Sequence, residues 1–137
     1  MREILFRGKS NWADGKVKVG DWLYSMTISR HCYTDEEITS YYIGSGNKTI
    51  DGKTLGQYTG LTDKNDKKIF EGDIVKVEYT GVNTGLNGVS KVVFENCKFA
   101  LVWGWHKEIV CLTDFSNVTF NVIGNIHDNP ELLESEG

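Results

Sequence analysis

The chain is poor in the residues and segments that mark a membrane or secreted protein. Its 137 residues include one proline and three cysteines. No apolar run approaches the ~18 residues that a membrane-spanning helix needs, so we expect no membrane partner. Near the N-terminus only Ile4, Leu5 and Phe6 are apolar together, and we therefore expect no signal peptide.

The cysteines give no sign of disulfides or of a metal site. Cys32, Cys97 and Cys111 are odd in number, widely spaced and form no Cys-x-x-Cys pair. Together with the missing signal peptide, this predicts reduced thiols in a cytoplasmic protein. His31 and Cys32 are adjacent, which is not the spacing that metal ligands favour, so we expect neither metal nor cofactor.

The charge is unevenly distributed. Fifteen basic and nineteen acidic residues give a net charge of −4. Residues 1–55 carry eight basic and seven acidic side chains, whereas residues 56–137 carry seven and twelve. An acidic second half repels phosphate backbones, which disfavours nucleic-acid binding there.

The rest of the composition predicts a folded, mainly β protein. Apolar residues make up 39% and the sixteen aromatics can fill much of a small core. In residues 1–55 we expect an irregular β lobe with strands at 3–7, 16–29 (interrupted near Gly20-Asp21) and 40–43, and one helical turn at 34–37. Asp14-Gly15 is a strong turn signal.

The central stretch QYTGLTDKNDKKIFEGDIVKVEY, residues 57–79, is the most sharply specified part of the chain. We expect a hairpin whose tip contains Asn65 and Asp66, then a turn at Glu71, Gly72 and Asp73 with Gly72 at positive φ. Residues 73–79 alternate as a strand.

Four further short strands follow, at 91–95, 98–103, 108–112 and 118–123, after a Gly- and Asn-rich loop. With residues 73–79 they number five, which predicts an SH3-like barrel within a C-terminal lobe of residues 56–137. Residues 128–133 predict a short closing helix with Pro130 in its first turn. The two lobes are expected to form one compact unit.

Three segments in this order resemble the YopX family of phage and prophage proteins. They are REILFRG at residues 2–8, GQYTGLTDKNDKKIFEGDIVKV at 56–77, and FNVIGNIHDNPELLE at 120–134. The family usually has glycine after the asparagine of the central turn, where this chain has Asp66. The resemblance implies a mainly β protein of a phage or prophage, and it brings no catalytic residue because the family has no agreed activity.

The motifs favour structure over chemistry. Asp63 and Asn65 begin like a calcium loop, but Lys67 and Lys68 stand where such a loop needs an oxygen ligand and a glycine. We therefore expect a solvated hairpin tip there instead. Asp73 can bond nearby backbone amides, which explains it without catalysis. We therefore expect no enzyme, although a cleft joining Glu71, Asp73 and a histidine would favour one.

Two stretches are candidate binding surfaces. Trp103 and Trp105 flank a glycine, and an exposed tryptophan there could stack on a base, a sugar or a partner. Trp12 lies among basic residues that include Arg7 and Lys9, the minimal pattern of a single-strand-binding face.

The sequence therefore predicts an accessory binding or assembly protein that forms a homo-oligomer or binds a host or phage protein. Single-stranded nucleic-acid binding through the basic N-terminal segment is the alternative.

Overall fold

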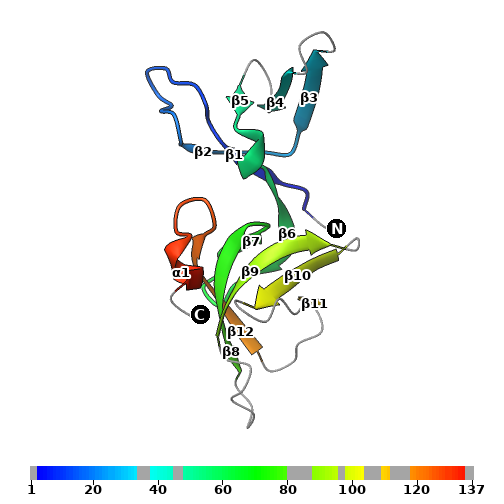
Figure 1. Cartoon of the computed structure of the whole chain (residues 1–137), viewed down its shortest axis with the longest axis vertical. Coiled ribbons are helices and arrows are strands. Elements are labelled where there is room, and N and C mark those ends of the chain that lie inside the picture. The colour runs from blue at the N-terminus through cyan, green and yellow to red at the C-terminus, as the bar shows by residue number, and fades with distance from the viewer. Residues whose placement is uncertain are drawn as a thin grey trace. The chain divides into compact units, whose positions relative to one another are not determined.

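A computed structural model describes residues 3–33, 38–44, 48–79, 88–95, 98–103, 109–111 and 118–134 (Figure 1). The prediction of a mainly β protein is confirmed, since strands dominate and the helical elements are one 3-10 turn and α1 (Glu131–Glu134) among these residues. The chain divides into two compact units, Met1–Tyr58 and Thr59–Gly137. The helical turn predicted at 34–37 lies outside the described residues.

The first unit contains two small antiparallel sheets. In one, β1 (Phe6–Lys9) pairs with β2 (Trp22–Ser25) and with the first residues of β6 (Gly56–Thr62). In the other, β4 (Ile38–Ile43) lies between β3 (Ile28–Tyr33) and β5 (Thr49–Ile50). A 3-10 turn, η1 (Gly52–Thr54), follows β5 and begins at the Asp51 cap.

The strand predicted over residues 16–29 is wrong before its expected interruption at Gly20-Asp21, and strands occur only after that point. Residues 10–21 form a loop closed by hydrogen bonds from Ser10 N to Asp21 O (2.8 Å) and from Gly20 N to Ser10 O (2.8 Å). The predicted turn at Asp14 is confirmed, because Asp14 N donates to Val17 O (2.8 Å). The alternation seen in the sequence belongs partly to this loop, and two separate strands follow it.

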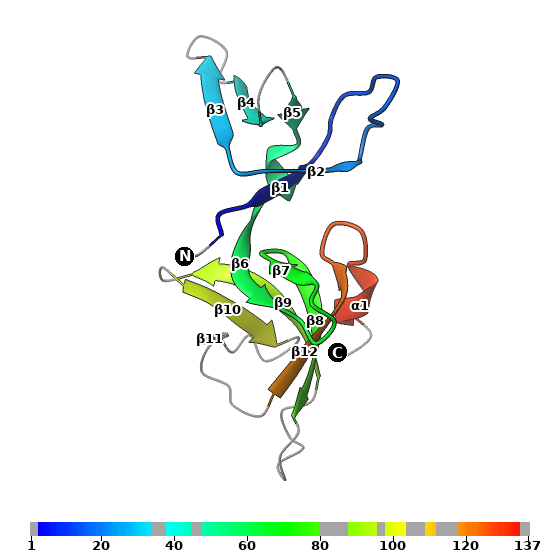
Figure 2. The same cartoon turned by 180° about the vertical axis from the view of Figure 1, so that it is seen from behind.

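The second unit is built around a five-stranded antiparallel sheet of order β11-β10-β9-β8-β12 (Figure 2). Its strands are β8 (Asp73–Tyr79), β9 (Gly88–Glu95), β10 (Lys98–Trp103), β11 (Ile109–Cys111) and β12 (Val118–Asn125). These are the five strands predicted from the sequence. The described pairings leave the sheet open between β11 and β12, so closure into an SH3-like barrel is not confirmed.

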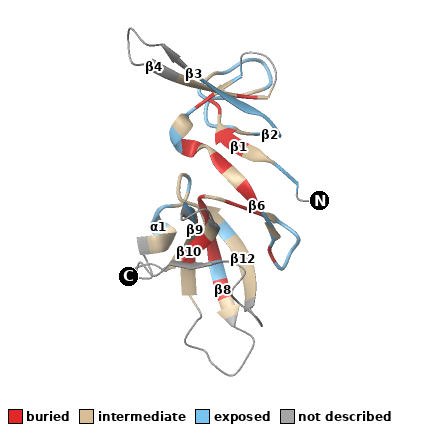
Figure 3. Cartoon of the chain, turned by 90° about the vertical axis from the view of Figure 1, so that its right-hand side faces the viewer, coloured by how far each residue is buried: buried red, intermediate tan, exposed pale blue. Residues whose placement is uncertain are grey.

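Alternation in β8 builds the core of this unit. Val75 and Val77 are fully buried with Val92 of β9, Leu101 of β10 and Ile69 of β7 (Lys68–Phe70) (Figure 3). Lys76, between the two valines, is exposed, as the two-residue period of a strand requires. The short helix α1 packs against β9, and Asn129 O accepts from Leu132 N (3.1 Å) at its start.

Candidate functional site

The hairpin tip of the central stretch covers the free edge of a strand. In the sheet order β12 is an outer strand, and its Phe120 O accepts from Lys64 N (2.9 Å). Asn65 Nδ2 donates to Asn121 Oδ1 (3.2 Å). An unpaired strand edge invites aggregation, so the tip stabilises and protects β12.

Asp63 is the centre of this arrangement. The residue is 6% exposed, and its carboxylate accepts from the backbone N–H groups of Asn65 (2.8 Å), Lys67 (3.0 Å) and Val122 (2.9 Å). Burial raises the pKa of Asp63, whereas these three hydrogen bonds and the charge of Lys67 lower it, and the balance lies below the ordinary value of 3.8. The prediction of a solvated hairpin tip is wrong for Asp63, which is buried.

A second junction links the Gly72 turn to the C-terminal motif. Gly72 has a φ of 92°, the conformation predicted for it, and its carbonyl accepts from Ile126 N (2.9 Å). Asn125 Oδ1 accepts from His127 N (3.0 Å) and Asp128 N (2.9 Å), which folds the chain after β12 into a tight turn. Two of the motifs that carry the family resemblance therefore meet in space.

The same junction brings His127 to the acidic turn. A Cβ placed on Gly72 would lie 3.7 Å from His127 Nε2. Asp73 is 1% exposed and its Oδ2 accepts from Phe70 N (2.7 Å), which is the local backbone bonding expected for it. That carboxylate thus has a structural role at the start of β8.

The basic N-terminal stretch meets a different tryptophan from the one predicted. The guanidinium carbon of Arg7 lies 4.6 Å from the ring centre of Trp22, and Lys9 Nζ lies 5.5 Å from it. The strand register explains this, since Lys9 stands opposite Trp22 and Arg7 opposite Tyr24. Both cations therefore stack on one ring. The register of β1 with β2 cannot be read from the sequence alone, and so the role of Trp22 was missed.

Burial limits what the predicted residues can contact. Arg7 is only 6% exposed and Lys9 is half-buried. Trp12 is half-buried too, and its indole nitrogen has no hydrogen-bond acceptor among the described residues. Trp105 and the side chain of Trp103 lie outside the described part of the chain.

Exposed apolar side chains gather in one segment of the first unit. Val19 is 68% exposed, Tyr24 53%, Met26 71% and Ile28 37%. We call residues 19–28 the apolar segment. It includes β2 and the start of β3, and both strands are outermost in their sheets as described.

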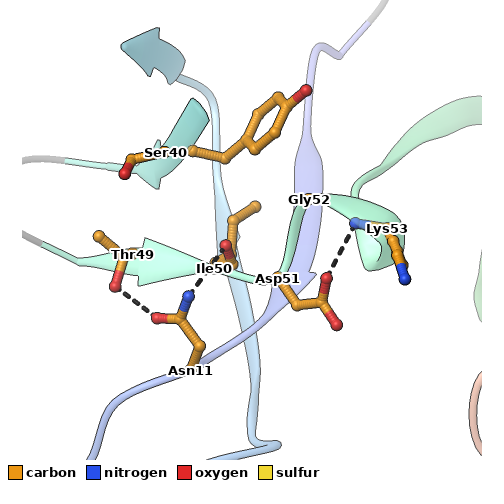
Figure 4. A pocket seen from close by; sticks show the side chains of 8 residues that line it. Asn11, Ser40, Thr49, Ile50, Asp51, Gly52 and Lys53 are labelled. Carbon is orange, nitrogen blue, oxygen red and sulfur yellow. Dashed lines mark hydrogen bonds between the residues drawn. The ribbon is translucent and has the colours of Figure 1, made fainter. Parts of the chain in front are cut away.

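An open depression of about 620 Å³ also lies in the first unit (Figure 4). It is formed by the chain after β1, by β4 and β5, and by the start of η1. Its lining consists of Asn11, Ser40, Tyr41, Thr49, Ile50, Asp51, Gly52 and Lys53. The volume lies within the range of roughly 300–1,000 Å³ that is usual for small-molecule sites.

Neither metal ligands nor membrane helices add a further candidate. Within the described ranges, no three His, Cys, Asp or Glu side chains gather as metal ligands would. Among the same residues, no helix is long and apolar enough to cross a membrane.

Comparison with known proteins places the chain in a family. The YopX protein family matches residues 5–134, and the chain belongs to this family. The crystal structure of protein yopX from Bacillus subtilis aligns with a TM-score of 0.56 at 16% identity, over 96% of this chain and 98% of that one. This likeness shows a shared fold.

A second solved structure is protein EF1440 from Enterococcus faecalis, with a TM-score of 0.49 and 21% identity over 97% of this chain and 99% of that one. No curated protein matches the chain.

Proposed function

We propose that this chain is a non-catalytic binding and assembly module of a phage or prophage, acting in the cytoplasm of a bacterial host. Its second unit serves as an SH3-like scaffold. The supporting observation is that the strongest sequence motif is used for structure: Asp63, Asn65 and Gly72 all bond β12 or the chain just after it. Because the polar groups of this motif bond other parts of the same chain, we expect ligands or partners to bind at other surfaces.

The apolar segment is the surface that best supports assembly. Four large apolar side chains within ten residues leave an apolar surface that association would remove from water. The outer strands β2 and β3 also offer backbone groups that a further strand can bond. We therefore propose a homo-oligomer that forms through residues 19–28, with a host or phage protein as the other class of partner.

Light scattering coupled to size exclusion tests this proposal. The wild-type chain is expected to give a mass above the 15.5 kDa of one subunit at high micromolar concentration. Met26→Lys combined with Val19→Lys should shift the mass toward the monomer, because each lysine would place a charge in the buried interface. Ile4→Lys is the matched control, since Ile4 is 54% exposed but lies outside the segment.

A monomeric wild-type chain would overturn self-association. A pull-down from host lysate with nuclease then asks whether the same segment binds another protein, and loss of that partner in the double variant would keep the assembly role.

The second candidate is single-stranded nucleic-acid binding by the face that Lys9, Trp22 and Tyr24 share. The half-buried Lys9 beside Trp22 and the exposed Tyr24 give a cation and aromatic rings on one face of β1 and β2. This role requires binding of an oligonucleotide that weakens steeply with salt. Lys9→Glu should reduce that binding, and affinity that is unchanged in this variant would exclude the face.

A further inference from the structure

We propose that the open depression of the first unit binds a neutral carbohydrate, with the Tyr41 ring as a platform and Asp51 and Lys53 as hydrogen-bonding groups. This inference goes beyond the assembly role, because no residue of the depression belongs to the apolar segment. One proposal can therefore fail while the other stands.

Hydrogen bonds brace the wall of the depression that Asn11 and residues 49–51 form. Asn11 Nδ2 donates to Ile50 O (3.4 Å), and Asn11 Oδ1 accepts from the Thr49 hydroxyl (Figure 4). Asp51 N donates to Lys9 O (2.9 Å), which joins the chain between β5 and η1 to the end of β1. Ile50 is 2% exposed and anchors this wall in the core of the first unit. The site is therefore formed before a ligand arrives, which lowers the entropic cost of binding.

The aromatic ring is also held in place. A Cβ added to Gly52 would clash with the Tyr41 ring, so the glycine allows the backbone to pack directly against that ring. This contact fixes the ring where it lines the depression. Aromatic rings offer a flat apolar surface, and the carbon–hydrogen face of a sugar ring matches such a surface in shape and polarity.

Several polar groups at this site have no partner within the part of the chain that the structure describes. They are the hydroxyls of Ser40 and Tyr41, the ammonium of Lys53 and the Oδ2 atom of Asp51, whose Oδ1 accepts from Lys53 N (3.1 Å). The set contains a pure acceptor, a pure donor and two groups that do both. Sugar hydroxyls donate and accept in the same way, so they can satisfy all four groups.

The charges of the lining residues favour a neutral sugar over charged polar ligands. Asp51 and Lys53 carry opposite charges and cancel locally, whereas a phosphate or polyanion would meet the Asp51 carboxylate. The depression is too polar for a purely apolar ligand, because most of its lining side chains are polar or charged.

The test is an NMR titration of the ¹⁵N-labelled full chain with glucose, galactose, N-acetylglucosamine and maltose. The changes in the backbone amide chemical shifts report binding. At least one sugar should give saturable shifts confined to residues 11, 40–41 and 49–53. Absence of saturable shifts at millimolar concentrations would overturn the proposal. So would a stronger response to inorganic phosphate than to any sugar.

Two variants and one control locate the binding. Asp51→Asn keeps an oxygen that accepts from Lys53 N but removes the charge. The Kd for the sugar should rise about tenfold, because the loss of a hydrogen bond to a charged group changes affinity by about this factor. Lys53→Gln should act in the same direction. Lys48→Gln changes an exposed lysine outside the lining and should leave the affinity unchanged. Equal affinity in wild type and both site variants would overturn the assignment.

Discussion

The carboxylate of Asp63 accepts a hydrogen bond from the backbone N–H of Val122, a residue 59 positions later in the chain. Val122 lies beside an irregularity in the pairing of β12 with β8, where the register shifts between Val122 and Gly124. At such a bulge the strand needs partners from outside the ladder. Asp63 supplies one, and in doing so it joins the two longest motifs of the family resemblance.

Replacing Asp63 should therefore destabilise the second unit strongly. Asp63→Ala leaves the partly buried N–H groups of Asn65, Lys67 and Val122 without their acceptor, and we expect a loss of about 2–3 kcal/mol in the free energy of unfolding. Urea denaturation followed by tryptophan fluorescence measures this loss. The control is Lys64→Ala, which removes only an exposed ion pair with Glu78 (3.8 Å) and should cost less than about 0.5 kcal/mol.

Asp63 also makes stability depend on acid. Its pKa in the folded chain lies below the ordinary value of 3.8, so the unfolded chain takes up this proton first as the pH falls. The contribution of Asp63 is thus fully present above about pH 4 and is lost as the pH falls through the folded pKa. Asp63→Asn cannot titrate there, so its free energy of unfolding should fall less steeply with acid than that of wild type. Parallel curves for the two proteins would show that Asp63 does not titrate in this range.

Local pattern in the second unit was strong enough to predict its strands. The alternation at 73–79 and the turn residues Asp66 and Gly72 specify geometry that neighbours in sequence can impose, and both turn residues have positive φ, 62° and 92°. The first unit was harder to predict because backbone bonds between the two ends of residues 10–21, such as Ser10 N to Asp21 O, close this stretch into a loop, and no local pattern shows them. The alternation there resembled a strand, and tertiary bonding made it a loop.

The candidate surfaces depended on information that the sequence lacks. Arg7 and Lys9 were named as a basic face, but only the structure reveals that both lie against the Trp22 ring and that Arg7 is buried. The depression in the first unit brings Asn11 together with Tyr41 and Asp51, which are 30 and 40 residues away in sequence. No spacing rule connects such residues.

Gly72 should tolerate substitution poorly. A side chain at φ 92° is strained, so Gly72→Val should cost on the order of 1–3 kcal/mol, and Gly72→Ala should cost less than valine because it is not β-branched. The midpoint of thermal unfolding reports the effect. Gly15→Ala is the control, because a Cβ there meets no atom within 4 Å and its φ lies outside the strained region. If Gly72→Val and Gly15→Ala unfold at the same midpoint temperature, a side chain at position 72 causes no backbone strain, contrary to what the structure indicates.

Asp66 allows the reverse test, in which glycine is introduced at a position with positive φ. It is the non-glycine residue with positive φ among the described residues, at 62°. Asp66→Gly should raise the free energy of unfolding by up to about 1 kcal/mol, because relief of backbone strain exceeds the entropy that a glycine adds to the unfolded chain. Asp66→Val should lower it, since a β-branched residue is least suited to this backbone. The side chain of Asp66 is exposed, so neither change removes a buried contact, and chemical denaturation of both variants isolates the backbone effect. If valine were as stable as glycine here, backbone strain at the hairpin tip would be excluded as a determinant of this protein's stability.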